Sequence, residues 1–338
     1  MKSFNRRDFI KATAATGLGL SIGGTVFADN NLQAGKRVGI IGLDTSHSIA
    51  FTKALNAASP DAVYKGYKVV AAYPYGSKTI ASSADRIPGY IEQVKEMGVS
   101  IVGSIKELLQ QVDVVLLETN DGRLHREQAL EVFAAGKRMF IDKPIAASLE
   151  DAVAIFEASK KYKIPVFSAS SLRYIKGAAD LDKSKVIGAD AYSPCTYEQS
   201  HPDLFWYGIH GVETLFTVMG TGCQQVTRIH TEDTDLVVGT WEGGRIGTFR
   251  GTRSGKSGYG GLVYTESGNV TLGPYGGYDP LLVEIIKYFE TGKVPVSPEE
   301  TLEIFAFMAA ADESKAQGGR AVNMKEVLKK AQSNYKGA

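Results

Sequence analysis

The turn that follows the apolar segment Arg37–Gly42 holds the first residues of the chain whose types and spacing could bind a ligand. A strand that ends at a glycine and leads into a helix is where doubly wound proteins bind the pyrophosphate of a dinucleotide. The fingerprint G-x-G-x-x-G needs its second glycine for the approach of the pyrophosphate and its third for close packing of helix on strand. Only Gly42 of the three is present, and Asp44 and His47 occupy the other two places.

Asp44 bears directly on anion binding, because an N-cap residue occupies the helix amides that a phosphate would use. Three outcomes are open: a dinucleotide binds with a shifted pyrophosphate, Asp44 and His47 pair and point away, or the site takes no dinucleotide. The next strand ends in Tyr73-Pro74-Tyr75-Gly76-Ser77-Lys78, without the acidic residue that grips an NAD ribose. Ser77 and Lys78 could instead meet a 2′-phosphate, which would favour NADP, although Lys78 is more simply a solvated loop residue.

Strands and helices alternate through the first half of the chain, and several strands are nearly all apolar. This pattern indicates a parallel sheet covered on both faces, which with right-handed crossovers is the doubly wound Rossmann fold. The predicted strands are Arg37–Gly42, Lys68–Ala72, Val99–Val102, Asp113–Leu117, Arg138–Ile141 and Pro165–Ala169, and the predicted helices are Ile49–Ala57, Tyr90–Met97, Ile105–Gln110, Leu124–Ala135 and Leu149–Tyr162.

Near Ser170 the pattern changes to β-like segments with little helix between them, which predicts an open antiparallel β-sheet domain with helices on one face. The Gly-rich segment Gly251–Gly261 is interpreted as a mobile loop or hairpin. The predicted strands are Gly188–Tyr192, Gln224–His230, Asp235–Trp241, Gly244–Phe249, Leu262–Thr265 and Asn269–Leu272, and the predicted helices are Tyr207–Met219, Pro280–Glu290 and Thr301–Lys315. The expected domains are residues 35–170 and 171–338.

Three landmarks stand in order along the chain: the glycine turn at Gly42, Asp142-Lys143-Pro144 at the end of a strand, and Gly208-Ile209-His210-Gly211-Val212-Glu213 in the second half. Together they resemble the Gfo/Idh/MocA family over essentially the whole mature chain. The resemblance implies an N-terminal Rossmann domain, a C-terminal open antiparallel sheet, and oxidation or reduction of sugars and cyclitols with NAD or NADP. It also implies a homo-oligomer, because the open sheet serves as a subunit interface in the family.

The resemblance implies two catalytic roles. Lys143 would lie beside the nicotinamide and the reacting carbinol, where an ammonium can polarise the oxygen and help to move its proton. His210 would act near the substrate hydroxyl as acid or base, although a hydrogen-bonded core histidine is a serious rival interpretation. Many members carry an aspartate four residues before this histidine, where this chain has Trp206.

A substitute for that lost aspartate has to come from nearby residues. Tyr207, Asp203 and His201 are the candidates, and Glu213 could orient His210 from the same helical face. The full set of predicted site residues is Lys143, His210 and Tyr207 for catalysis, Gly42, Asp44, Ser46, His47, Thr119, Asn120, His125, Lys143 and Pro144 for the cofactor, and Arg173, Tyr174, Trp206 and Glu213 for the substrate. No His, Asp, Glu or Cys cluster has metal-ligand spacing in the sequence, so no metal site is predicted.

Composition narrows the class of partner. The chain has 338 residues, 38 basic and 37 acidic, and a formal net charge of +1, which argues against a nucleic-acid or membrane-surface binder and favours a small molecule. Its cysteines are Cys195 and Cys223, without a CxxC motif. They could pair in an oxidising compartment, and two buried free thiols are at least as consistent with the sequence.

The N-terminus predicts export. Arg6-Arg7-Asp8-Phe9-Ile10 resembles a twin-arginine signal, and the small residues around Ala28 suit cleavage after it, so residues 1–28 are expected to be a leader. This predicts the twin-arginine export machinery as a partner, a periplasmic location and no stable membrane anchor.

The leading hypothesis is an exported NAD(P)-dependent oxidoreductase that transfers a hydride to or from a carbohydrate or cyclitol hydroxyl. Free NAD is scarce outside the cytoplasm, so the cofactor is expected to be tightly held. Redox-neutral chemistry over one turnover, as in sugar conversion or glycoside cleavage, would fit that constraint. The alternative is a sugar-binding protein or pseudoenzyme on the same fold, which Asp44, His47 and Trp206 favour.

Overall fold

The computed structural model describes residues 35–335, and the first part of that range forms a six-stranded sheet. Neighbouring strands are parallel throughout, in the order β3-β2-β1-β4-β5-β6. The strands are β1 (Arg37–Ile41), β2 (Lys68–Tyr73), β3 (Ser100–Ile101), β4 (Val114–Leu117), β5 (Arg138–Ile141) and β6 (Val166–Ser168). This is the strand order of the doubly wound Rossmann fold, so the predicted fold of this half is confirmed.

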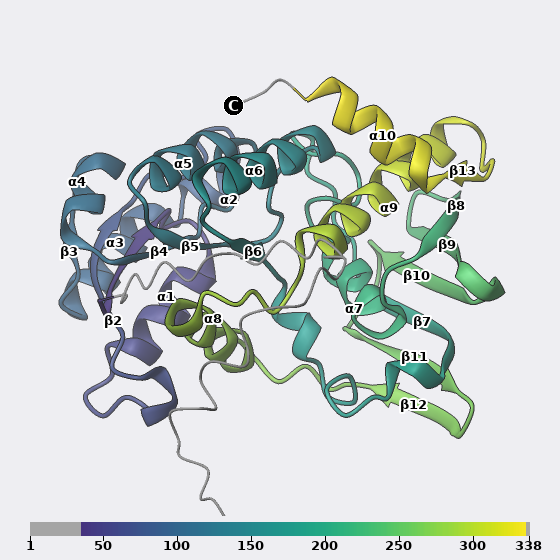
Figure 1. Ribbon diagram of the computed structural model, residues 1–338, viewed down its shortest axis with the longest axis horizontal. Coiled ribbons are helices and arrows are strands. Elements are labelled where there is room, and N and C mark those ends of the chain that lie inside the picture. The colour runs from purple at the N-terminus through teal and green to yellow at the C-terminus, as the bar shows by residue number, and fades with distance from the viewer. Residues whose placement is uncertain (1–34, 336–338) are drawn as a thin grey trace, which may run out of the picture. The chain divides into compact units, whose positions relative to one another are not determined.

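Apolar side chains project from both faces of this sheet and are covered by helices. The sequences of its strands are therefore continuous hydrophobic runs. All four residues of β4 are fully buried. Helices α4 (Ile105–Gln111), α5 (Gly122–Ala134) and α6 (Leu149–Tyr162) cover one face, and α1 (Ser46–Leu55), α3 (Ile87–Glu96) and α8 (Asp279–Thr291) cover the other (Figure 1). The short helix α2 (Ala81–Ala84) lies in the loop after β2.

Helix α8 comes from the C-terminal part of the chain and still completes the core of the first sheet. Its residues Leu281, Leu282 and Ile285 are buried in the same apolar cluster as Val38 and Ile40 of β1. The chain therefore returns to the first sheet after it has built most of the second one.

The second sheet has seven strands in the order β12-β11-β7-β10-β9-β8-β13. They are β7 (Val186–Pro194), β8 (Cys223–His230), β9 (Thr234–Trp241), β10 (Ile246–Thr252), β11 (Gly260–Thr265), β12 (Gly268–Leu272) and β13 (Val322–Asn323). The predicted antiparallel sheet needs one correction, because β7 and β10 pair in parallel and the sheet is mixed. The two are not consecutive: β8 and β9 intervene along the chain, so the connection can bring β10 back in the same direction.

Of the two interpretations of Gly251–Gly261, a loop or a hairpin, the structure shows the loop. Strands β10 and β11 flank this segment in the sequence, but both pair with β7, on its opposite edges. The glycine-rich segment therefore crosses the end of a third strand instead of turning tightly between two neighbours.

Helices α7 (Ile209–Met219) and α9 (Pro298–Ala316) pack on one face of the second sheet, and α10 (Met324–Asn334) packs against α9 (Figure 1). A glycine allows α7 to approach closely: a Cβ on Gly211 would lie 2.3 Å from Cε2 of Phe249. This contact fixes the height of α7 above the sheet and hence the position of the side chains on it.

Two further predictions concern features outside the sheets. Cys195 and Cys223 are free, buried thiols, and burial raises the pKa of each to about 12, so they do not pair. The predicted leader, residues 1–28, lies outside the described residues. From residue 35 to residue 335, no helix is long and apolar enough to cross a membrane.

Candidate active site

A cavity of about 440 Å³ opens where the carboxyl ends of β1, β4 and β5 face the start of α7. This is the edge at which open α/β sheets bind ligands. Of the predicted site residues, Ser46, His47, Asn120, Lys143, Trp206, Tyr207 and His210 line this cavity. Gly42, Asp44, Thr119, His125, Pro144, Arg173, Tyr174 and Glu213 are not part of its lining.

Lys143 reaches the cavity from the turn after β5. Its backbone amide donates to the Asp142 carboxylate at 2.8 Å, which fixes the direction of the turn. The Lys143 ammonium lies 5.9 Å from the centroid of the Tyr207 ring, within the range of a cation–π interaction. Within the described residues it donates no hydrogen bond, so its N–H groups are available to a ligand oxygen.

His210 lies near the start of α7 and is held by a residue that the sequence analysis missed. Its Nδ1 lies 2.7 Å from the hydroxyl of Ser170, which also accepts from the Leu172 amide. Burial, with Lys143 and His47 nearby, lowers the pKa of His210 well below 6.5, so the ring is neutral at pH 7. With Nδ1 engaged, Nε2 is the ring nitrogen left for a substrate.

Glu213 does not orient His210 directly, contrary to the prediction. Its carboxylate accepts from the Ser170 amide at 2.8 Å and from Nε of Arg173 at 2.9 Å. Arg173 is also paired with Glu300 and is buried away from the cavity lining. Glu213 and Arg173 therefore hold the loop that carries Ser170, and their predicted contact with a substrate is corrected to this indirect role.

Tyr174 and His125 also lie outside the cavity lining. Burial raises the pKa of the Tyr174 hydroxyl, which has no hydrogen-bond partner. The two ring nitrogens of His125 contact the carbonyl oxygens of Thr119 and Ile145, so this fully buried ring ties the loop after β4 to the loop after β5. The structure thus favours the helix-start interpretation of His125.

Aromatic side chains wall the rest of the cavity. The Tyr207 ring lies 5.2 Å from His210, and its hydroxyl accepts from Tyr259 at 3.3 Å. Two more tyrosines that the sequence analysis did not assign to the site, Tyr275 and Tyr278, bond to Ser171 and Ser46, respectively. Such rings offer both flat apolar faces and hydroxyl groups, a combination that suits a polyhydroxylated ring.

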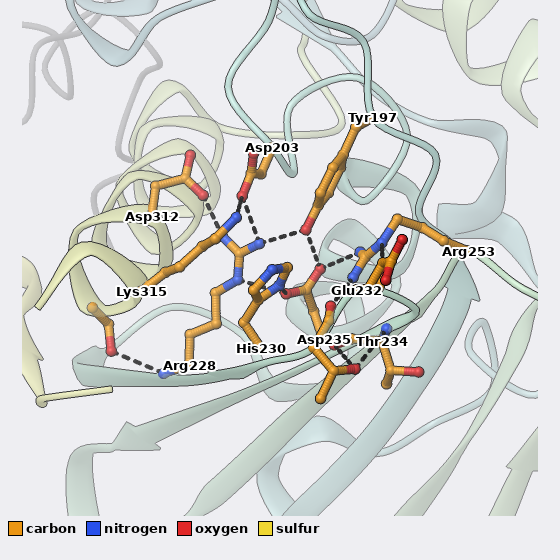
Figure 2. A network of polar contacts seen from close by, with 12 residues as sticks. Tyr197, Asp203, Arg228, His230, Glu232, Thr234, Asp235, Arg253, Asp312 and Lys315 are labelled. Carbon is orange, nitrogen blue, oxygen red and sulfur yellow. Dashed lines mark hydrogen bonds and ion pairs between the residues drawn. The ribbon is translucent and has the colours of Figure 1, made fainter. Parts of the chain in front are cut away.

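Asp203 and His201 do not substitute for the missing aspartate of His210. Figure 2 shows Asp203 in an ionic network around the buried Arg228, which it contacts at 2.8 Å. Lys315 donates to the same carboxylate, and Asp235 accepts from Nε of Arg228 at 2.8 Å on the other side. The His201 ring instead packs on Trp206, with centroids 5.0 Å apart.

The sequence offers Asp44, Thr45 and Ser46 as candidate caps of α1, and the Asp44 carboxylate is not the one that caps it. Thr45 is the N-cap, and fully buried Asp44 accepts from the amides of Ser77 at 3.1 Å and Asn120 at 3.0 Å. Burial raises the pKa of Asp44 to about 6. His47 approaches Asp142 at 2.9 Å, so the open possibility that Asp44 and His47 pair with each other is wrong.

These bonds fasten the loop after β2 to the loop after β4. The Ser77 hydroxyl donates to Asp121 at 2.8 Å, and the Asn120 side-chain amide donates to Ser83 at 3.0 Å. The Ser77 hydroxyl is therefore engaged by Asp121, and its contact with a 2′-phosphate stays a prediction. The Lys78 ammonium lies over the Tyr75 ring at 5.1 Å, away from the cavity.

The turn at Gly42 is where the pyrophosphate of a dinucleotide would bind, so its geometry bears on whether a dinucleotide fits. Gly42 has a φ of +93°, and a Cβ there would lie 2.4 Å from the Thr119 nitrogen, so the first glycine position keeps its role. The Asp44 and His47 side chains occupy the second and third glycine positions, where the fingerprint has no side chain. Ser46, at the start of α1, and Arg86 both line the cavity. The N-terminus of α1 and the Arg86 guanidinium are therefore the groups that would hold the pyrophosphate of a dinucleotide bound in a shifted position.

Three buried side chains with no metal-ligand spacing in the sequence come together in the fold; the expectation of no metal stays a prediction. His47, Glu118 and Asp142 each offer one ligand atom, and these atoms lie within 4.8 Å of one another. Sequence spacing gave no signal, because the three residues come from three different turns.

Residues 36–170 match the family model for the Gfo/Idh/MocA oxidoreductase family with an NAD-binding Rossmann fold. A curated relative, an uncharacterized oxidoreductase of Streptococcus pneumoniae serotype 4, is 28% identical over 120 residues, which are 33% of this chain and 32% of the relative. The matching segment thus spans about a third of that protein. These matches support the predicted family resemblance and the predicted oxidoreductase class.

Solved structures share the fold over nearly their whole length. A probable dehydrogenase from Thermotoga maritima has a TM-score of 0.67 at 20% identity and covers 86% of this chain and 99% of its own. The myo-inositol dehydrogenase from Lactobacillus casei, solved with NAD(H) and myo-inositol, has a TM-score of 0.67 at 17% identity and covers 85% of this chain and 96% of its own. The two-sheet fold class is therefore confirmed.

Proposed function

We propose that this chain is an NAD(P)-dependent oxidoreductase that transfers a hydride to or from a hydroxyl-bearing carbon of a carbohydrate or cyclitol. One observation carries the proposal: the Lys143 ammonium, without a hydrogen-bond partner among residues 35–335, and the neutral imidazole of His210 face one cavity at the carboxyl edge of a sheet of NAD-binding type. The substrate class is supported by the aromatic wall and by the myo-inositol dehydrogenase of the same fold.

The chemistry of these residues follows from their charges. A bound nicotinamide supplies the hydride acceptor or donor. The Lys143 ammonium donates a hydrogen bond to the substrate oxygen and stabilises its developing negative charge. Nε2 of neutral His210 takes the hydroxyl proton during oxidation and returns it during reduction. Because the Ser170 hydroxyl can donate or accept, it stabilises both neutral tautomers of the ring.

Single variants of the two residues test the chemistry. Lys143→Ala and His210→Gln should each lower kcat/KM by about 10²- to 10⁴-fold, the range of positioned acid–base groups. Lys160→Ala is the control, because Lys160 is exposed on α6 and does not line the cavity, so its loss should leave turnover unchanged. The assay follows nicotinamide absorbance with inositols and aldoses as probes. Full activity in Lys143→Ala would contradict the proposal.

Cofactor retention forms a separate part of the proposal. We infer that one NAD or NADP stays tightly bound, because a chain exported with the twin-arginine motif Arg6-Arg7 would fold before it crosses the membrane and would carry its cofactor with it. Mass spectrometry of the nucleotide released on denaturation tests retention. Cell fractionation of wild type and an Arg6→Lys/Arg7→Lys variant tests periplasmic export, which should fail in the variant.

The Asp44 bridge favours a second candidate, a sugar-binding protein without redox chemistry. Its carboxylate closes the space between the loops after β2 and β4, next to the turn where a dinucleotide usually passes. Calorimetry separates the two functions: sugar binding without any binding of NAD or NADP, and with no turnover, would support this candidate over the oxidoreductase.

A further inference from the structure

Three buried side chains meet beneath the floor of the cavity, and the oxidoreductase proposal uses none of them. His47 is in the first turn of α1, Glu118 follows β4, and Asp142 follows β5. Strands β1, β4 and β5 are neighbours in the sheet, so their carboxyl ends bring these residues together. Nδ1 of His47 lies 2.9 Å from Oδ2 of Asp142 and 3.9 Å from Oε2 of Glu118.

Both carboxylates are fully buried, and that of Glu118 is unsatisfied. Glu118 and Asp142 have no exposed surface, and within residues 35–335 neither oxygen of Glu118 has a hydrogen-bond partner. Oδ2 of Asp142 faces Nδ1 of His47 at 2.9 Å, and its other oxygen accepts from the Lys143 amide. A buried carboxylate that is left unpaired carries a large desolvation cost, and such a group in a folded protein points to an unseen ion or proton.

The three ligand atoms lie within 4.8 Å of one another, close enough to converge on one ion. Ligand atoms at about 2.0–2.2 Å from a metal lie roughly 3–3.5 Å from one another in tetrahedral or octahedral geometry. The His47–Asp142 distance of 2.9 Å is near that range and is also that of a hydrogen bond, whereas the His47–Glu118 distance of 3.9 Å would shorten on binding. The third carboxylate nearby, on Asp44, is already held by two amides and does not join the cluster.

We propose that His47, Glu118 and Asp142 bind a divalent transition-metal ion. One imidazole nitrogen with two carboxylates is the donor set of Zn²⁺, Mn²⁺ or Fe²⁺, whereas Mg²⁺ and Ca²⁺ favour oxygen ligands alone. Three protein ligands leave at least one position open, and His47 lines the cavity, so that position faces the bound molecule. The ligand expected there is a hydroxyl oxygen of the substrate, or water in its absence.

This site gives a physical reason for the altered glycine fingerprint. A glycine at position 47 has no side chain, so the ion would lose its only nitrogen ligand. The side chain that replaces the third glycine reaches across to the ends of β4 and β5, where Glu118 and Asp142 lie.

Metal content is the direct test. Full-length protein without a polyhistidine tag is stripped with a chelator and titrated separately with Zn²⁺, Mn²⁺ and Mg²⁺, with bound metal measured by mass spectrometry and melting temperature by scanning calorimetry. We expect one equivalent of Zn²⁺ or Mn²⁺, weaker Mg²⁺ binding, and a melting temperature that rises with bound ion.

Variants separate ligation from folding. Glu118→Gln should weaken binding by more than the roughly 10- to 100-fold that loss of an outer-shell partner costs. Glu131→Gln, at an exposed position on α5, is the matched control and should bind as wild type. If Glu118→Gln fails to fold, absorption bands of Co²⁺ added to stripped wild type, sensitive to imidazole coordination, provide the second readout.

Some results would overturn the proposal. Stripped wild type that binds no equivalent of Zn²⁺ or Mn²⁺ and shows no metal-dependent melting temperature would mean that the cluster holds a proton instead, with a neutral Glu118 beside a His47–Asp142 ion pair. A gain in stability of Glu118→Gln in that protein would agree with the proton. Neither result depends on turnover, so the oxidoreductase proposal would stand or fall separately.

Discussion

At the scale of single residues, Asp44 connects two loops at the carboxyl edge of the first sheet. Its carboxylate joins two loops through the amides of Ser77 and Asn120. Gly76 makes room for it, since a Cβ there would lie 2.2 Å from Oδ2 of Asp44. The bridge therefore orders the edge of the sheet and fills the space between the two loops, and one substitution reports on both effects.

Asp44→Gly should restore the second fingerprint glycine. We expect tighter binding of NAD or NADP, because the side chain between the two loops is removed, and a free energy of unfolding lower by about 2 kcal/mol, because two buried amides lose a charged acceptor. Calorimetric titration and urea denaturation measure the two quantities. If affinity is unchanged or falls, Asp44 is not an obstacle to the dinucleotide.

The pH dependence of His210 has a definite sign. Its pKa is lowered well below 6.5 by burial, so the folded ring stays neutral as the pH falls through 6.5, while the ring in the unfolded chain takes up a proton. The free energy of unfolding should therefore decline as the pH drops below about 6.5, and His210→Gln should lessen that decline. Activity in the direction of oxidation should persist at pH 6.5 and fall only under more acidic conditions. An acid limb of kcat/KM at or above 6.5 would contradict a neutral His210.

At the scale of elements, local sequence patterns predicted the positions of individual strands and helices. The apolar run of β4 and the helical period of α7 place both elements within a residue or two of their bounds. The parallel pairing of β7 with β10 could not be predicted from local patterns. It pairs residues such as Asp190 and Thr248, which two other strands, β8 and β9, separate along the chain. The C-terminal elements β13 and α10 were not predicted either; β13 has only two residues and no alternation to read.

The residues of the candidate site also fall into those that local motifs predict and those that only long-range contacts bring together. Lys143 and His210 were found because each belongs to a short motif in a matching position along the chain. Ser170 was missed because its partner His210 is 40 residues further on. Glu118 was missed because a single acid at the end of a strand looks solvated until the fold buries it. Contacts between distant turns are set by the sheet order, which periodicity alone does not specify.

Helix α7 depends on Gly211, and this dependence can be measured. Gly211→Ala would place a Cβ 2.3 Å from Phe249, so the helix must move away from the sheet and carry His210 with it. We expect a loss of about 1–3 kcal/mol in the free energy of unfolding, as for overpacked cores, together with reduced kcat/KM. Gly89→Ala in α3 is the control, because nothing lies within 4 Å of the added atom and alanine favours helix. Equal stability of wild type and Gly211→Ala would show that the contact is not tight.

At the scale of the whole molecule, no helix of residues 35–335 covers the outer face of the second sheet. Ile229 and Ile246 are 59% and 53% exposed, and Tyr192 is 46% exposed. The register aligns them on one face: Ile229 lies opposite Leu236, Leu236 opposite Arg250, and Arg250 opposite Tyr192. Exposed apolar side chains that gather on one sheet face, here with Arg250 among them, are typical of a subunit interface.

We therefore expect the protein to form a homo-oligomer through this face. Ile229→Glu should shift it towards the monomer, because a second copy would have to bury the new charge against apolar side chains. Val63→Glu is the matched control, since Val63 is 37% exposed on the first half of the chain, far along the sequence from the second sheet. Light scattering coupled to size-exclusion chromatography measures the molar mass of each. A wild type that is monomeric at micromolar concentration, or an Ile229→Glu variant with unchanged mass, would exclude this face as the interface and leave its exposed apolar side chains to another partner.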